Sequence, residues 1–177
     1  FAEPAGVEPV RRSTARVGDA ICVTGELGGS LLEDDAGSAH HLGFTPRLAA
    51  ARRLCENSAM RPHAMIDLSD GLGADLPRIC KASNVSAEVE LDTLPIRAVA
   101  KKHAEERGVE PWRSALNDGE DYELLFTLDA DHVPDEIDGL PVTRIGTVVE
   151  PGASPVQWRL HDQPIELPDA LGWEHRE

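Results

Sequence analysis

Two short acidic stretches carry the residue types best suited to chemistry. The first, MIDLSDGLGADL at 65–76, passes from a strand pattern into a helical pattern, with Asp67 and Asp70 at the change. Ser69 stands where a helix N-cap belongs, and Gly71 allows the backbone to approach a ligand closely. Two neighbouring carboxylates repel each other unless they share a cation, for which Mg²⁺ is the natural choice. The pattern predicts a magnesium and phosphate site at a helix N-terminus, although a plain capping turn explains DLSDG equally well.

The second stretch, NDGEDYELLF at 117–126, places three acids around a tyrosine just before an apolar strand. Asn-Asp-Gly is a turn signal, so Glu120 lies on the turn itself and is the best candidate of the three for contact with a ligand. Asp121 and Glu123 either face water or come close to the other carboxylates, and the sequence leaves both interpretations open.

Hydrophobic periodicity indicates the elements that must position these acids. We expect an α+β fold, a mixed β-sheet with helices packed over it, because strands and helices alternate without a strict βαβ rhythm. The helix at 45–59 is predicted to have Thr45 as its cap and Pro46 at its first position. The expected strands are 20–24, 64–69, 86–95, 122–129, 142–149 and 156–160, and the expected helices are 45–59, 70–83 and 97–108, with a short helix within 29–38.

Composition narrows the class of protein. The 177 residues include 17 basic and 32 acidic ones, a net charge of -15, which opposes binding to nucleic acid or to a membrane surface. No apolar run approaches the ~20 residues that span a bilayer, and we find no signal peptide. The three cysteines are far apart and form no CxxC pair, which predicts neither a disulfide framework nor a zinc site. This is typical of a protein in a reducing compartment. We therefore expect a cytoplasmic protein.

At the two acidic stretches the sequence resembles the thiamine-monophosphate kinase family, whose signatures are D-[IL]-S-D-G-L and, some fifty residues later, G-G-E-D-Y-E-L. Asp118 stands here where a second glycine is usual, and Thr14 replaces the glycine after Arg-Ser. The segments RRSTARVGDAICVTGELG, TPRLAAARRL and GWEHRE also resemble the family, so the similarity runs from Val10 to His175. It implies the C-terminal domain of the aminoimidazole ribonucleotide synthetase-related superfamily.

The resemblance covers only the C-terminal half of such a kinase. We expect residues 1–16 to be a segment that enters from a missing N-terminal half, and residues 17–177 to form the domain. The first residue is Phe1 rather than methionine, which agrees with this expectation. In the family the N-terminal half forms the dimer barrel and supplies further metal-binding aspartates. The resemblance thus implies a homodimer for the full-length enzyme and little turnover for this chain alone.

The implied reaction transfers phosphate from ATP to thiamine monophosphate, which gives ADP and thiamine diphosphate. Carried over by position, Asp67 and Asp70 are catalytic Mg²⁺ ligands, and Ser69 contacts the nucleotide. Arg12 is the implied ATP-contacting arginine, with a solvated linker charge as its alternative. No GxxxxGK[ST] phosphate loop is present, so the implied catalysis depends on positioning and metal charge.

The implied substrate contacts are Glu120, a carboxylate for the cationic thiazolium ring, and Trp173, which stacks on the ring system. A hydrophobic anchor for the C-terminus is the alternative for Trp173. Two other functions remain open. The chain is either part of another ATP-dependent enzyme of the superfamily with a different acceptor, or a non-catalytic domain that only holds Mg-nucleotide.

Overall fold

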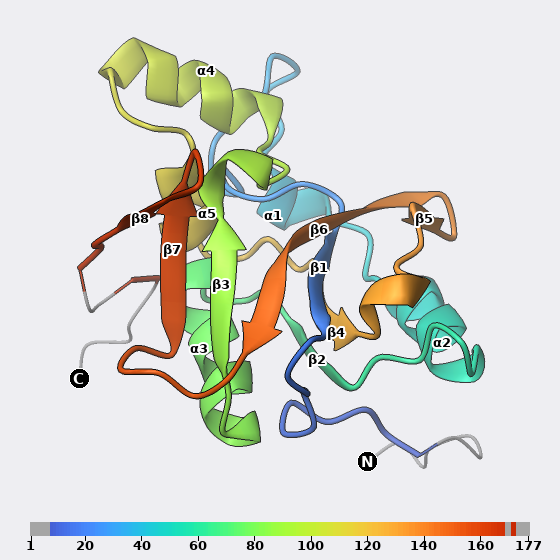
Figure 1. Ribbon diagram of the computed structural model, residues 1–177. Coiled ribbons are helices and arrows are strands. Elements are labelled where there is room, and N and C mark those ends of the chain that lie inside the picture. The colour runs from blue at the N-terminus through green and yellow to red at the C-terminus, as the bar shows by residue number, and fades with distance from the viewer. Residues whose placement is uncertain (1–7, 169–170, 173–177) are drawn as a thin grey trace, which may run out of the picture.

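The computed structural model describes residues 8–168 and 171–172, which are built around one mixed β-sheet of eight strands (Figure 1). The strand order is β2-β4-β1-β6-β3-β7-β8, with β5 paired to β6. β3 and β7 run parallel, and the other neighbouring pairs run antiparallel. The strands are β1 (Ala20–Thr24), β2 (Ala64–Asp67), β3 (Ser86–Glu90), β4 (Leu124–Leu128), β5 (Glu136–Ile137), β6 (Leu140–Val149), β7 (Val156–Leu160) and β8 (Gln163–Ile165).

Helices cover this sheet, which confirms the predicted α+β class. They are α1 (His40–Gly43), α2 (Leu48–Glu56), α3 (Leu72–Ser83), α4 (Ala98–Arg107) and α5 (Trp112–Asn117), with short 3₁₀ turns η1 (Leu91–Thr93) and η2 (Ala130–His132). Among the helices of the described residues, none has both the length and the apolar character needed to cross a membrane.

The strand β1 shows how the sheet divides the core into two layers. All five of its residues are buried, and successive side chains point to opposite faces. Ile21 and Val23 join the cluster that includes α3 and α5, whereas Ala20 and Cys22 join the cluster that includes α2. Helices therefore cover both faces at this strand, and Figure 1 shows α4 beyond one end of β3 and β7.

Helix α3 buries the face that its sequence predicts. The side chains at helical spacing, Leu72, Leu76, Ile79 and Cys80, are all at most 1% exposed. The helix begins at Leu72, two residues later than expected, because Gly71 at its N-cap has φ +92°. The following strand β3 likewise ends at Glu90, where η1 replaces the last part of the expected strand 86–95.

Two helix predictions near the first third of the chain are wrong. Helix α2 begins at Leu48 with Arg47 as N-cap, so Thr45 is not the cap and Pro46 is not its first residue. The guanidinium of Arg47 binds the buried carboxylate of Glu123, and this contact keeps the residues before Leu48 out of the helix. No helix forms at 29–38 because the Asp34 carboxylate accepts the N–H groups of two residues just after it, which favours a turn.

Three chain segments leave the sheet along the same edge. In the antiparallel pair β2–β4, the last residue of β2, Asp67, lies opposite the first residue of β4, Leu124. The end of β1 lies on the other side of the same β4 end, since Val23 pairs with Leu125. The loop after β2, the loop before β4 and the loop after β1 therefore meet the sheet side by side.

Candidate functional site

The two acidic stretches of the sequence form one site at this edge. Their backbones continue the β2–β4 pairing beyond the strands. The N–H of Leu68 donates to the carbonyl of Glu123 at 2.9 Å, and the N–H of Tyr122 donates to Leu68 at 2.8 Å. The N–H of Glu120 then donates to the Ser69 carbonyl at 2.8 Å. We call residues 67–71 and 117–123 together the acidic junction.

Two glycines let the backbones of the acidic junction come this close. A Cβ placed on Gly71 lies 2.8 Å from the carbonyl oxygen of Leu116, and one on Gly119 lies 2.7 Å from that of Ser69. Atoms at such distances clash, so neither position has room for a side chain. The close approach expected at Gly71 is therefore an approach to the protein's own backbone.

Asp121 ties the acidic junction to the loop after β1. Its carboxylate is buried and accepts the N–H of Gly28 at 3.0 and 3.1 Å and the Arg97 guanidinium at 2.6 Å. Burial raises the pKa of Asp121 to about 7, and Arg97 and the Gly28 N–H oppose that rise. Asp118 holds the next amide, that of Gly29, at 2.8 Å. Asp121 and Asp118 thus hold the backbone of the loop at Gly28 and Gly29.

Glu123 is buried as well, with only 1% of its side chain exposed. Its two carboxylate oxygens accept from Arg47 at 2.6 and 2.8 Å, and the hydroxyl of Thr24 donates to it at 2.7 Å. Hydrogen bonding to Glu123 raises the pKa of Arg47. The interpretation that Asp121 and Glu123 face water is thus wrong, because both side chains are buried and each pairs with an arginine from a distant part of the chain.

A buried acid missed by the sequence analysis holds the loop between β2 and α3. Ser69 was expected to be the helix N-cap, but the N-cap is Gly71, which has no side chain that could cap the helix. Instead, the carboxylate of Asp75 accepts the backbone N–H groups of Ser69 and Asp70 at 2.9 and 3.0 Å. An acid in the first turn of a helix is the sequence signal for such a contact. Burial raises the pKa of Asp75, while these N–H groups and Arg78 lower it.

Four acids of the junction are not buried, and one of them, the half-buried Asp118, already holds the Gly29 amide. Asp67 is exposed at the end of β2, and Asp70 and Glu120 are half-buried. Arg12 is exposed, but its carbonyl accepts from Ser83 at the far end of α3, about 18 Å away for a helix of 12 residues. The described residues therefore do not bring Arg12 to the junction.

The described part of the C-terminal tail reaches the acidic junction. The N–H of Gly172 donates to the side-chain oxygen of Asn117 at 3.2 Å. A Cβ on Gly172 lies 2.6 Å from the carbonyl oxygen of Asp70, so the two backbones are in close contact. Trp173, the residue predicted to stack on a substrate ring, lies outside the described residues.

The donor set of the junction fits Mg²⁺ shared with a phosphate. Over residues 8–168 and 171–172, no three histidine, cysteine or acidic side chains come close enough together to hold a metal ion. Mg²⁺ in phosphate-handling sites commonly takes one or two carboxylates and completes its shell with water and phosphate oxygens. The carboxylates of Asp67 and Asp70 are hard oxygen donors of this kind.

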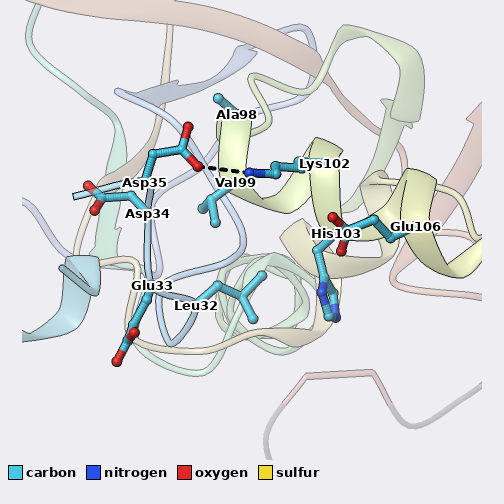
Figure 2. Close-up of a pocket in the computed structure, with 9 residues that line it drawn as sticks. All are labelled: Leu32, Glu33, Asp34, Asp35, Ala98, Val99, Lys102, His103 and Glu106. Atoms are coloured by element: carbon cyan, nitrogen blue, oxygen red, sulfur yellow. Dashed lines mark hydrogen bonds and ion pairs between the residues drawn. The ribbon is translucent and has the colours of Figure 1, made fainter. Parts of the chain in front are cut away.

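A separate hollow of about 390 Å³ lies between the loop at 32–35 and helix α4. Figure 2 shows Lys102 reaching from α4 to Asp35, and the two charged groups are 2.8 Å apart. Both side chains are largely exposed, so water and salt weaken their attraction. None of the residues that line this hollow belongs to the acidic junction, and we assign it no role.

The geometry of Gly71 leads to a first prediction. We expect Gly71→Ala to reduce the free energy of unfolding by about 2–4 kcal/mol, since the residue combines φ +92° and ψ 155° with the contact to Leu116. Gly37→Ala is the matched control, because Gly37 has φ +75° but open space around it, and we expect a loss of only about 1 kcal/mol. Urea unfolding measures both, and equal losses would contradict the clash.

A family model and curated relatives both relate this chain to one protein family. Residues 16–159 match the family model described as AIR synthase related protein, C-terminal domain. The chain is 43% identical over 145 residues to the thiamine-monophosphate kinase of Rhodopirellula baltica, covering 80% of this chain and 43% of that protein. It is 39% identical over 140 residues to the enzyme of Salmonella typhimurium, covering 71% and 41%. The chain thus spans less than half the length of these two curated relatives.

Solved structures extend the comparison. AaThiL complexed with AMPPCP and TMP superposes with a TM-score of 0.74 at 31% identity, covering 94% of this chain and 54% of that one. The thiamine monophosphate kinase of Aquifex aeolicus gives a TM-score of 0.71 at 31% identity, covering 89% and 55%. The hydrogenase maturation protein HypE in complex with ATP is 20% identical with a TM-score of 0.66, covering 95% and 54%, and shares the fold alone.

Proposed function

Because this chain belongs to the family of the C-terminal domain of AIR synthase related proteins, we propose that it is the C-terminal half of a thiamine-monophosphate kinase. The observation that carries the proposal is the acidic junction, where β2 and β4 join the two sequence signatures and leave Asp67, Asp70 and Glu120 accessible. The similarity to curated kinases, and to a solved relative that holds an ATP analogue and TMP, supports the same reaction.

In this reaction the terminal phosphoryl group of ATP passes to the phosphate of thiamine monophosphate. The acceptor is an anionic oxygen, so the transfer needs no strong base, and the main difficulty is to bring two polyanions together. Bound Mg²⁺ supplies positive charge that lowers this repulsion. The accessible carboxylates of Asp67 and Asp70 hold the cation, and Ser69 on the same loop contacts the nucleotide.

The substrate side of the proposal concerns Glu120, Trp173 and Arg12. Glu120 is half-buried next to Asp121 and offers a negative charge to the thiazolium ring. Trp173 follows Gly172, which contacts the junction, and it stacks on the ring system of thiamine. The Arg12 carbonyl is held at the far end of α3, so the proposed contact of Arg12 with ATP requires the assembled enzyme, where residues 1–16 join the N-terminal half to the domain at 17–177. The full-length enzyme is a cytoplasmic homodimer.

The experiment is a coupled ADP-release assay of this chain with and without its N-terminal half. We expect clear turnover with thiamine monophosphate for the complete protein and less than about 1% of it for the isolated chain, because two carboxylates hold little metal without further ligands. Near-full activity of the isolated chain would contradict the half-enzyme. Activity of the complete protein with a different phosphate acceptor but not with thiamine monophosphate would identify another enzyme of the superfamily.

A further inference from the structure

Arg78 on α3 binds two acids of different kinds at once. One of its terminal nitrogens, Nη1, lies 2.5 Å from Asp75 Oδ1, and the other, Nη2, lies 2.5 Å from Asp70 Oδ2. Asp75 is the buried acid that holds the loop, whereas Asp70 is one of the accessible acids of the junction. The guanidinium therefore connects a structural carboxylate to one that is open to ligands.

The two contacts differ in how easily they can be given up. The Asp75 side chain is 0% exposed and also accepts two backbone N–H groups. If Arg78 left it, the buried carboxylate would have no counter-charge. The Asp70 side chain is 21% exposed and that of Arg78 is 42% exposed. Water and salt screen this outer contact, so it is the weaker of the two.

A cation that binds Asp70 is repelled by the guanidinium of Arg78, which is already bound there. The Arg78 guanidinium occupies Oδ2 of Asp70, and a second cation on either carboxylate oxygen lies within a few ångströms of it. Like charges at this separation repel each other, and the repulsion is stronger where water is excluded. An arginine guanidinium keeps its charge at any physiological pH, so this counter-charge is permanent.

We propose that Arg78 is the resident counter-charge of Asp70, which lowers the affinity of the acidic junction for free divalent cations and yields Asp70 only when a nucleotide brings its own phosphate charges. The inference rests on the proposed function, since it assumes that Asp70 binds the cation of a Mg-nucleotide. Asp75 is the anchor that keeps Arg78 in place after Asp70 is released. Arg78 is thus a positioning residue that sets how much Mg²⁺ the site requires.

The test uses the full-length enzyme and measures binding rather than turnover. Calorimetry gives the affinity for AMPPCP at a series of Mg²⁺ concentrations, and hence the Mg²⁺ concentration of half-maximal binding. We expect Arg78→Gln to lower that concentration about 3- to 10-fold, because the competing charge is gone. Arg52→Gln is the control, since the Arg52 side chain is 74% exposed and the ion pair that it makes with Glu56, at 3.9 Å, lies on the surface of α2.

An unchanged or higher Mg²⁺ requirement in Arg78→Gln would overturn the inference, and a higher one would mean that Arg78 contacts the phosphates. If Arg78→Gln does not fold, Arg78→Lys decides. Its single ammonium is expected to stay with the buried Asp75 and free Asp70, so half-maximal binding must occur at less Mg²⁺ than in the wild type. A wild-type enzyme that neither binds Mg-AMPPCP nor phosphorylates thiamine monophosphate would instead refute the proposed function.

Discussion

Asp70→Asn in the complete enzyme is expected to lower kcat with thiamine monophosphate at least about 100-fold, a loss of roughly 3 kcal/mol of transition-state stabilisation. The amide keeps the shape of the carboxylate and still accepts a hydrogen bond from Arg78, so the loop at 67–71 should retain its conformation. The substitution removes only the negative charge that holds the cation. A coupled assay at increasing Mg²⁺ concentrations should show partial recovery of the rate.

Asp131→Asn is the matched control for this prediction. Asp131 is an exposed aspartate in η2, which follows β4 at the end opposite the acidic junction. The same change of charge there should leave both kcat and the Mg²⁺ requirement within about twofold of the wild type, as is usual for exposed sites without special contacts. If the two variants behave alike, or if Asp70→Asn keeps its rate and Mg²⁺ dependence, Asp70 is not a metal ligand.

Arg47→Met is expected to destabilise the complete protein by about 3–5 kcal/mol, because it leaves the carboxylate of Glu123 buried without its cation. The hydroxyl of Thr24 remains as a donor to Glu123 but does not supply a charge. The backbone carbonyl of Glu123 also accepts the N–H of Leu68, so we expect a shift of Glu123 to weaken the pairing of the two segments of the acidic junction. Chemical denaturation followed by circular dichroism measures the free energy of unfolding.

The double variant Arg47→Met, Glu123→Gln separates the two explanations for such a loss. Removing both charges should restore part of the stability, because a neutral amide costs less to bury than an unpaired carboxylate. Arg52→Met on the exposed side of the same helix should change the free energy of unfolding by no more than about 0.5 kcal/mol. A double variant less stable than Arg47→Met would show that packing, and not charge, explains the effect.

Local patterns predicted much of the fold. The expected strands 20–24 and 156–160 have the bounds of β1 and β7. The helix expected at 97–108 is α4, which ends at Arg107 and has Gly108 as its left-handed C-cap. These elements depend on neighbouring residues alone. The helix α5 (Trp112–Asn117) and the strand β8 (Gln163–Ile165) were missed, because six and three residues are too short to show a period.

The parts of the site that sequence reasoning missed depend on contacts between distant residues. The partner of Asp121 is Arg97, 24 residues away, and the partner of Glu123 is Arg47, 76 residues away. No local pattern indicates which arginine neutralises which acid, so the burial of these two side chains was not predictable. Asp75 is different, because it stands in the first turn of α3, and the error was to give its role to Ser69.

The order of the strands has a consequence for how the chain folds as it is synthesised. β1, β2 and β3 come first in the chain, yet each takes its sheet neighbours from strands made later: β4 for β2, β4 and β6 for β1, and β6 and β7 for β3. A ribosome that has reached residue 120 of this chain has therefore made three strands before their partners exist. Unpaired strand edges can pair with other chains, so we expect this domain to aggregate more readily during synthesis than after β4, β6 and β7 have formed. The acidic junction assembles only once β4 has emerged between β1 and β2.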